Sequence, residues 1–157
     1  MNSERPAQVS AERVLALYRT MARIRSFENA AEAASRGGVA LFGSDAASAQ
    51  ASVRGPLHLS TGQEAVAAGV CANRDRCDYL TSTHRGHGHT IAKGGDVRAM
   101  MCELFGRATG SNGGKGGSMH IADFSVGMLG ANGVVAAGIP IAVGAAHSGR
   151  LLQAAGT

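Results

Sequence analysis

Histidines and an arginine concentrate in one short glycine-containing segment of the chain. Residues 82–89 read Ser-Thr-His-Arg-Gly-His-Gly-His, which places His84, Arg85, His87 and His89 within six positions. Arginine stays charged and grips phosphate with two parallel donors, and imidazole suits proton transfer near neutral pH. This composition favours a site for a phosphorylated ligand. Two other interpretations stay open at this point: a metal site built by the imidazoles, and a surface loop that merely carries histidines.

Two further glycine-rich segments follow along the chain. Residues 110–120 read Gly-Ser-Asn-Gly-Gly-Lys-Gly-Gly-Ser-Met-His, and residues 130–135 read Gly-Ala-Asn-Gly-Val-Val. Glycine lets a backbone approach a ligand closely, and consecutive N–H groups can bind an anion. The first segment is not a Walker loop, however. Thr109 and Gly116 stand where that motif needs a glycine and a hydroxyl residue.

The segments before the histidines predict the elements that position them. Apolar residues spaced three and four apart predict a helix that is capped by Ser10 and runs to about Ser35. Capping-box spacing at Thr61 predicts a second helix to about Cys71. Residues 78–82 read as a short strand that ends at the histidine segment.

The segments after the histidines continue the same alternation. Asp96 is expected to cap a helix that ends at Gly106, with buried methionines on its apolar face. A helix rich in small residues begins at Ile139, tolerates Pro140 in its first turn and ends near Arg150. Strands alternating with helices predict an α/β fold with a mainly parallel sheet flanked by helices.

With these motifs in order, the chain resembles the α subunit of the thiamine-diphosphate-dependent dehydrogenase component of 2-oxo acid dehydrogenase complexes. The likeness covers about residues 9–147, and the Thr-His-Arg-Gly-His-Gly-His run is most similar to the acetoin dehydrogenase branch. Besides 82–89, the matching motifs are residues 58–65 (His-Leu-Ser-Thr-Gly-Gln-Glu-Ala), 103–107 (Glu-Leu-Phe-Gly-Arg), 114–120 and 127–133. The resemblance implies the thiamine-diphosphate-binding fold, with only its N-terminal part in this chain. The expected organisation is a helical segment over 1–36, a flexible loop insertion over 37–56, and a portion of the cofactor-binding domain over 57–157.

The resemblance also implies roles for individual residues at a thiamine diphosphate site. Arg85 and His84 are expected to bind the diphosphate, since they occupy family positions that do so. Gly133 is expected to contact the aminopyrimidine end of the cofactor through its backbone. Val135 is expected to act as an apolar wedge that holds the two rings bent toward each other.

Two histidines are expected, by the same resemblance, to act on protons or to order the site. His58 precedes the Gly-Gln-Glu motif, and His87 is either an acid–base group or a residue that orders its loop. No metal ligand is expected within the chain. The family's Gly-Asp-Gly motif and following asparagine, which hold magnesium, are not found before Thr157. The sequence is therefore expected to be a fragment that is inactive alone.

The activity implied is that of an oxidoreductase. It cleaves or decarboxylates acetoin or a 2-oxo acid and passes the acyl group to a lipoyl acyltransferase component. A β subunit in an α₂β₂ assembly is the implied partner, and it supplies the glutamate that activates the cofactor. Two alternatives stay open: a thiamine-dependent transferase of the transketolase type, and a non-catalytic module that binds a phosphate-containing ligand.

Composition limits the remaining classes of function. The chain has 157 residues, 45% of them apolar and 17% charged, and a net charge of +4 from scattered basic side chains. Without a basic cluster or a long apolar run, neither nucleic-acid binding nor a membrane span is expected, and the location expected is cytoplasmic. The three cysteines have no Cys-x-x-Cys spacing, which favours reduced structural thiols.

Overall fold

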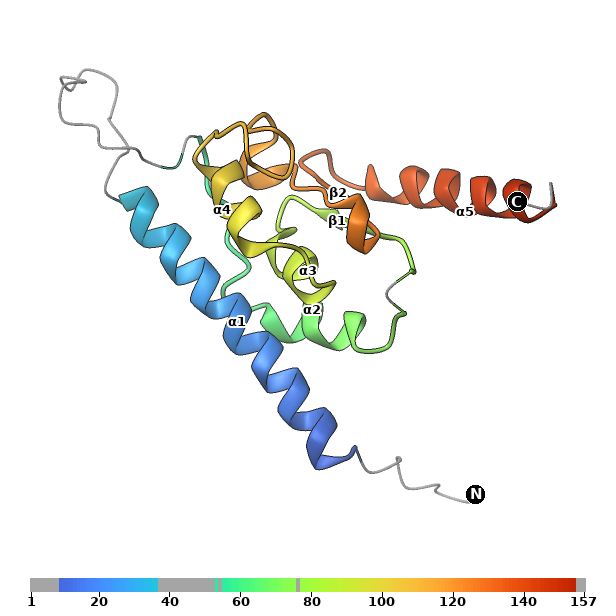
Figure 1. The fold of residues 1–157 in the computed structure, drawn as a ribbon, viewed down its shortest axis with the longest axis horizontal. Helices are drawn as coiled ribbons and strands as arrows, with labels where there is room; N and C mark the ends of the chain where they lie inside the picture. Colours follow the sequence, from blue (N-terminus) through green and yellow to red (C-terminus); the bar gives the residue numbers. More distant parts are fainter. Residues whose placement is uncertain (1–8, 37–52, 54, 76, 155–157) are drawn as a thin grey trace.

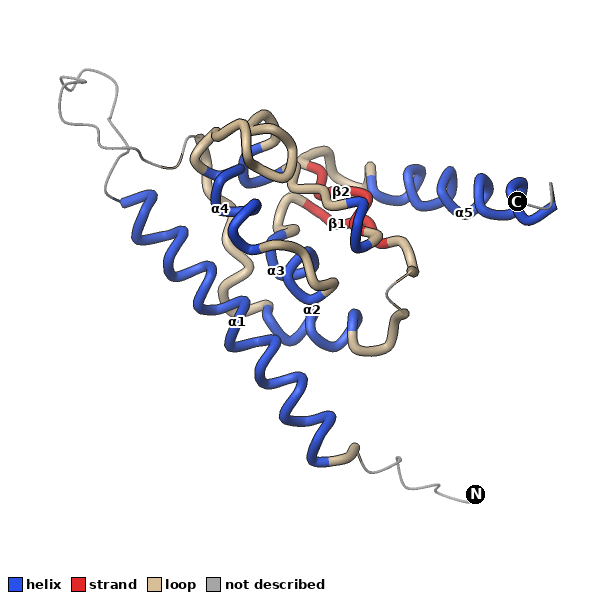
Figure 2. Tube along the Cα trace, viewed as in Figure 1, coloured by secondary structure: helices blue, strands red, loops and turns tan. Residues whose placement is uncertain are grey.

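The structure is a computed structural model that describes residues 9–36, 53, 55–75 and 77–154. Most of the loop insertion predicted over 37–56 lies outside the described residues. Figure 1 shows α1 along one side of the molecule, α5 projecting from the other, and the strands between them; Figure 2 shows the same view by element type. In chain order the elements are α1 (Ala11–Arg36), α2 (Glu64–Cys71), β1 (Leu80–Thr83), α3 (His87–Ala92), α4 (Val97–Leu104), η2 (Gly117–Met119), η3 (Phe124–Val126), β2 (Met128–Asn132) and α5 (Gly138–Ala154).

The sheet of the described residues consists of two parallel strands, β1 and β2. Ser82 pairs with Ala131 and Thr83 with Asn132. Parallel strands end at the same edge of a sheet, so the residues that follow β1 and β2 come together there. The predicted parallel pairing is confirmed for these strands, and β1 begins two residues later than expected.

The larger core lies between α1 and the shorter helices α2, α3 and α4. Ile24, Phe27 and Ala31 supply the contribution of α1, at the spacing of one helix face. The predicted apolar face does not extend to the start of this helix, however. Val14 is 54% and Tyr18 is 63% exposed, and within residues 11–20 only Leu17 and Thr20 are partly buried. The buried members of this core are Ile24, Phe27, Ala31, Val53, Ala67, Ile91, Met100, Leu104 and Ile121.

Three predicted helix ends agree with the structure. Ser10 Oγ accepts a hydrogen bond from the N–H of Arg13 at 3.2 Å, and an Asp96 carboxylate oxygen accepts from the N–H of Arg98 at 2.8 Å. Both are N-cap interactions that satisfy an otherwise free donor of the first turn. Gly106 follows α4 at a φ of +65°, and its N–H donates to the Glu103 carbonyl at 2.9 Å. A glycine is suited to this left-handed position.

Other predicted boundaries are corrected. Thr61 does not cap α2, which begins at Glu64 after Gln63 in the cap position. The reason is that the Glu64 carboxylate accepts from Arg25 and from the Gly62 N–H, so no capping box forms. The histidine segment is not a loop throughout, because α3 already begins at His87. Helix α5 continues to Ala154, and no helix in the described part of the chain is long and apolar enough to cross a membrane.

Candidate functional site

A cavity of about 360 Å³ lies where the two parallel strands end. We call it the strand-end cavity. Its walls come from the end of β1, from the segment after β2 and from the start of α5. It is lined by Thr81, Ser82, Thr83, His84, Asn132, Val134, Val135, Ala136, Gly138 and Ile139. Two residues that the sequence assigns to cofactor binding, His84 and Val135, therefore face one space although they lie far apart in the chain.

The turn after β2 presents Val135 to solvent. The Asn132 side-chain oxygen accepts from the N–H of Val134 at 2.8 Å, which closes the turn. Ala136 has a φ of +66°, a conformation that L-residues seldom adopt. Val135 is consequently 91% exposed at the cavity, a costly place for an apolar side chain. Gly133 follows β2 but does not line the cavity; a Cβ there would lie 3.5 Å from Met119 Sδ.

His58 and His84 lie against each other beside the strand-end cavity. Their ring centroids are 5.0 Å apart at an interplanar angle of 85°, an edge-to-face arrangement. His58 Nδ1 is buried and has no hydrogen-bond partner among the described residues. Buried polar atoms are almost always paired, so this nitrogen is a group that a ligand or water can satisfy.

Arg85 does not line the strand-end cavity. Its guanidinium donates a hydrogen bond to the carbonyl of Leu59, and Ser60 Oγ donates to the Arg85 carbonyl at 3.1 Å. Gly86 lets this loop lie against β2, since a Cβ at that position would collide with Ala131. The arginine is therefore half-buried and bound to the segment that carries His58.

His87 is fully buried at the start of α3. Its Nδ1 lies 3.0 and 3.1 Å from the two carboxylate oxygens of Glu28, and its Nε2 lies 3.1 Å from the hydroxyl and the carbonyl oxygen of Ser118. Its ring also meets Phe27 edge-on. Of the two roles that the resemblance allows, these contacts favour the ordering of the loop.

The second glycine-rich segment is organised by a carboxylate of the protein itself. Glu103 is fully buried on α4, and its two oxygens accept from four backbone N–H groups of residues 112–117 at 2.6–3.2 Å. Burial alone would raise the pKa of Glu103, but the four donors outweigh it and the pKa lies below its usual range. These N–H groups are already occupied, which agrees with the conclusion that this segment is not a phosphate loop.

The imidazoles do not converge on a metal ion. His89 Nδ1 pairs with Ser82 Oγ at 2.9 Å, and burial lowers the pKa of His89. The described part of the chain contains no cluster of three side chains of His, Cys, Asp or Glu that could hold one.

Burial raises the pKa of the Cys71 thiol, which makes this cysteine a poor nucleophile.

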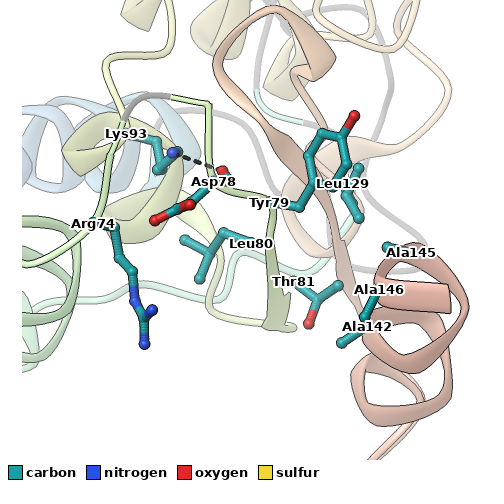
Figure 3. Close-up of a pocket in the computed structure, with 10 residues that line it drawn as sticks. All are labelled: Arg74, Asp78, Tyr79, Leu80, Thr81, Lys93, Leu129, Ala142, Ala145 and Ala146. Carbon is teal, nitrogen blue, oxygen red and sulfur yellow. Dashed lines mark hydrogen bonds between the residues drawn. The ribbon is translucent and has the colours of Figure 1, made fainter. Parts of the chain in front are cut away.

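A second cavity, of about 300 Å³, lies at the opposite end of β1 (Figure 3). Alanines of α5 form one wall, and Lys93 and Asp78 approach from the other side. Lys93 Nζ donates to the carbonyl of Asp78 at 2.8 Å and to that of Asp75 at 2.9 Å. The amino ends of the strands are not where ligands bind in open α/β sheets, which favours the strand-end cavity as the site.

Sequence reasoning missed two buried carboxylates: Glu28, which binds His87 and Ser60, and Glu103, which binds the second glycine-rich segment. Glu28 lies four residues after Ile24, and Glu103 lies three after Met100, so both sit on the apolar face of their helix. A carboxylate on a buried helix face is costly unless it is paired, and this was the available signal. Ser60 and Ser118 carried no such signal, since serine is common in loops.

Residues 41–155 match the family described as "Dehydrogenase E1 component". The α subunit of acetoin:2,6-dichlorophenolindophenol oxidoreductase from Bacillus subtilis is 49% identical over 142 residues, which is 90% of this chain and 39% of that protein. The protein of the same name from Cupriavidus necator is 46% identical over 86% of this chain and 37% of its own length.

A pyruvate dehydrogenase is a more distant relative. The mitochondrial pyruvate dehydrogenase E1 component subunit alpha of Saccharomyces cerevisiae is 35% identical over 90% of this chain and 30% of its own length. The chain thus spans about two fifths or less of these relatives.

Proposed function

The chain belongs to the family of dehydrogenase E1 components, and we propose that it anchors thiamine diphosphate in the α subunit of such a dehydrogenase. The enzyme acts on acetoin or a 2-oxo acid and passes the acyl group to a lipoyl acyltransferase component. The observation that carries this proposal is the strand-end cavity. It joins His84 to Val135 at the carboxyl ends of two parallel strands, which is the usual ligand position in such sheets.

The residues around this cavity fit the cofactor in chemical type. Thiamine diphosphate has two heteroaromatic rings and an anionic tail, so it needs an apolar contact and cationic or donor groups. Val135 and His84 line the cavity and offer an apolar contact and a donor, and Arg85, the residue after His84, offers a guanidinium. When bound, the cofactor supplies the carbon nucleophile for the substrate carbonyl.

The protein's own part is to bind, orient and handle protons. Val135 and Gly133 are both exposed, and they would hold the cofactor rings through an apolar side chain and a backbone contact. His58 lies against His84, which lines the cavity, and the proposal assigns to its imidazole the proton exchange with a substrate oxygen. His87 is buried behind them and orders the loop that carries Arg85.

Two further components belong to the proposal. The proposal includes magnesium, whose ligands the family resemblance assigns to a Gly-Asp-Gly motif and a following asparagine rather than to the described residues. A β subunit completes the site in an α₂β₂ assembly. The naming of the relatives as α subunits supports a partner of this kind.

Acetoin is the first substrate to test. Both acetoin oxidoreductase subunits match this chain over 86–90% of its length at 46–49% identity, whereas two pyruvate dehydrogenase subunits reach 48% over only 59% of it and 35% over 90% of it. The match to the dehydrogenase family also favours this chemistry over that of a transketolase-type transferase.

The experiment uses the complete α subunit assembled with its β partner and magnesium. Cofactor affinity is measured by titration calorimetry, and turnover is measured with acetoin, pyruvate and branched-chain 2-oxo acids and an artificial electron acceptor. Arg85→Ala should weaken cofactor binding at least tenfold, because losing a charge-assisted contact costs about 1.5–3 kcal/mol. Arg98→Ala, at an exposed position of α4, is the matched control and should leave affinity unchanged. Unchanged affinity in the Arg85 variant would remove this residue from the site, and no turnover with any substrate would overturn the proposal.

A further inference from the structure

The segment of residues 58–60 carries His58 but has no regular secondary structure. A strand or helix would fix such a segment through its backbone ladder. Here the position comes from other hydrogen bonds and from the packing of Leu59 against the larger core. The contacts of these three residues therefore decide where the His58 ring lies.

Hydrogen bonds connect both ends of this segment to one carboxylate, that of Glu28 in α1. Glu28 Oε1 accepts directly from the Ser60 N–H at 2.9 Å. At the other end, the His58 N–H donates to Ser118 Oγ at 2.9 Å, and that hydroxyl lies 3.1 Å from Nε2 of His87. His87 Nδ1 in turn lies 3.0 Å from Glu28 Oε2.

The contacts of His87 join the two ends of this chain of hydrogen bonds. Its Nδ1 faces both carboxylate oxygens of Glu28, and its Nε2 lies 3.1 Å from the Ser118 hydroxyl and from the Ser118 carbonyl oxygen. The Ser118 hydroxyl oxygen accepts from the His58 N–H. Both ring nitrogens of His87 are therefore held by polar partners, and His87 links Glu28 to Ser118.

Because it is buried, the Glu28 carboxylate needs hydrogen-bond partners within the protein. Glu28 and His87 are both fully buried, and Ser60 and Ser118 are nearly so. A polar group out of water is tolerated only when its hydrogen bonds are made, and removing one partner of such a network is costly. The network therefore holds one arrangement of the 58–60 segment rather than several.

We propose that Glu28 is a positioning residue for His58. It acts directly at Ser60 and through His87 and Ser118 at the His58 N–H, and so it fixes the ring of His58 against His84. Its importance for turnover rests on the proposed function. The physical claim about the 58–60 segment does not, and it can be measured without any cofactor.

The first test is amide hydrogen exchange of the complete subunit, followed by NMR or mass spectrometry. Glu28→Gln keeps the size of the side chain but presents an amide N–H₂ in place of one oxygen. It should speed exchange of the His58 and Ser60 amides at least tenfold. Ser118→Ala should speed exchange at His58 and leave Ser60 unchanged, because Ser60 keeps its own bond to Glu28. Glu12→Gln, at the exposed start of the same helix, is the matched control and should change neither amide.

The second test is turnover in the assembled enzyme. Glu28→Gln should lower kcat about 10- to 100-fold, the effect of a misplaced reacting group, with cofactor affinity changed less than threefold. The same change made in a His58→Ala background should cause no further loss, because Glu28 acts through His58.

The outcomes test separately the positioning of residues 58–60 by Glu28 and the proposed function. Unaltered exchange at His58 and Ser60 in the Glu28 variant would overturn the positioning role, whatever the enzyme does. Equal losses of kcat in the wild-type and His58→Ala backgrounds would also overturn it, since Glu28 would then act elsewhere. If the wild-type assembly shows no turnover, the proposed function fails and the exchange result alone decides the role of Glu28. Should Glu28→Gln fail to fold, Ser118→Ala tests the His58 half of the network by itself.

Discussion

The carboxylate of Glu103 offers the sharpest test of how the glycine-rich segment is held. Its two oxygens accept four backbone N–H bonds from residues 112–117, and the side chain is fully buried. Glu103→Ala removes all four acceptor contacts at once. Glu103→Gln leaves one oxygen, which can keep two of them, and turns an amide N–H₂ toward the other two donors.

The expected magnitude follows from the number of donors left without a partner. An unsatisfied buried donor costs about 1–3 kcal/mol. The segment is half-exposed, so water is expected to reach about half of the four donors. Glu103→Ala should then lower the free energy of unfolding by about 2–6 kcal/mol, and Glu103→Gln by about half as much.

The pH dependence of the stability provides a second test of the role of Glu103. The pKa of Glu103 is lowered in the folded state, so its contribution to stability is complete above the ordinary carboxyl pKa of about 4.3. That contribution disappears as the pH falls from there through the lower folded pKa. The gap in stability between the wild type and Glu103→Gln should accordingly shrink below about pH 4.3.

The assay is urea unfolding followed by circular dichroism, at pH 7 and at steps down to about pH 3, where the carboxyl groups titrate. Glu12→Gln, which removes an exposed carboxylate, should change stability by no more than about 0.5 kcal/mol. Glu103 variants that match this control at pH 7 would refute the reasoning. A difference in the free energy of unfolding between the wild type and Glu103→Gln that does not change with pH would also refute it.

Three other changes probe the fold. Leu104→Ala opens a cavity in the larger core, because Leu104 is 1% exposed, and should cost about 2–5 kcal/mol in urea unfolding; a smaller loss would mean that the core collapses around the site. Ala136→Gly should raise the midpoint of thermal unfolding slightly. A left-handed L-residue costs about 1–2 kcal/mol, and the entropy that glycine adds to the unfolded chain cancels only part of the relief of this strain. A lower midpoint would show that the turn is unstrained. The hydrogen bond from Arg25 lowers the pKa of Glu64 to about 2. Glu64→Gln should therefore lower the melting temperature at pH 7, and the melting temperatures of variant and wild type should converge as the pH falls from about 4.3 toward 2. A difference that stays constant with pH would exclude Glu64 ionisation as the cause.

The sequence by itself determined the local features of this protein. Ser10, Asp96 and Gly106 mark helix ends through groups that act within three or four residues, so their roles are readable without a fold. The order of the glycine and histidine motifs likewise sufficed to indicate the family. The Thr61 capping box failed because a distant residue, Arg25, captured the carboxylate that the local pattern assigned to it.

Only the tertiary structure decided how the candidate residues are grouped. Parallel pairing of β1 with β2 brings His84 beside Val135, and nothing in either segment alone specifies that pairing. The two histidines treated alike in the sequence also separate: His58 lies against His84 at the site, whereas His87 is buried on Glu28. Hydrogen bonds between residues far apart in the chain exist only once packing has brought them together and excluded water. That is why Glu28 and Glu103 became visible as organising groups only in the folded chain.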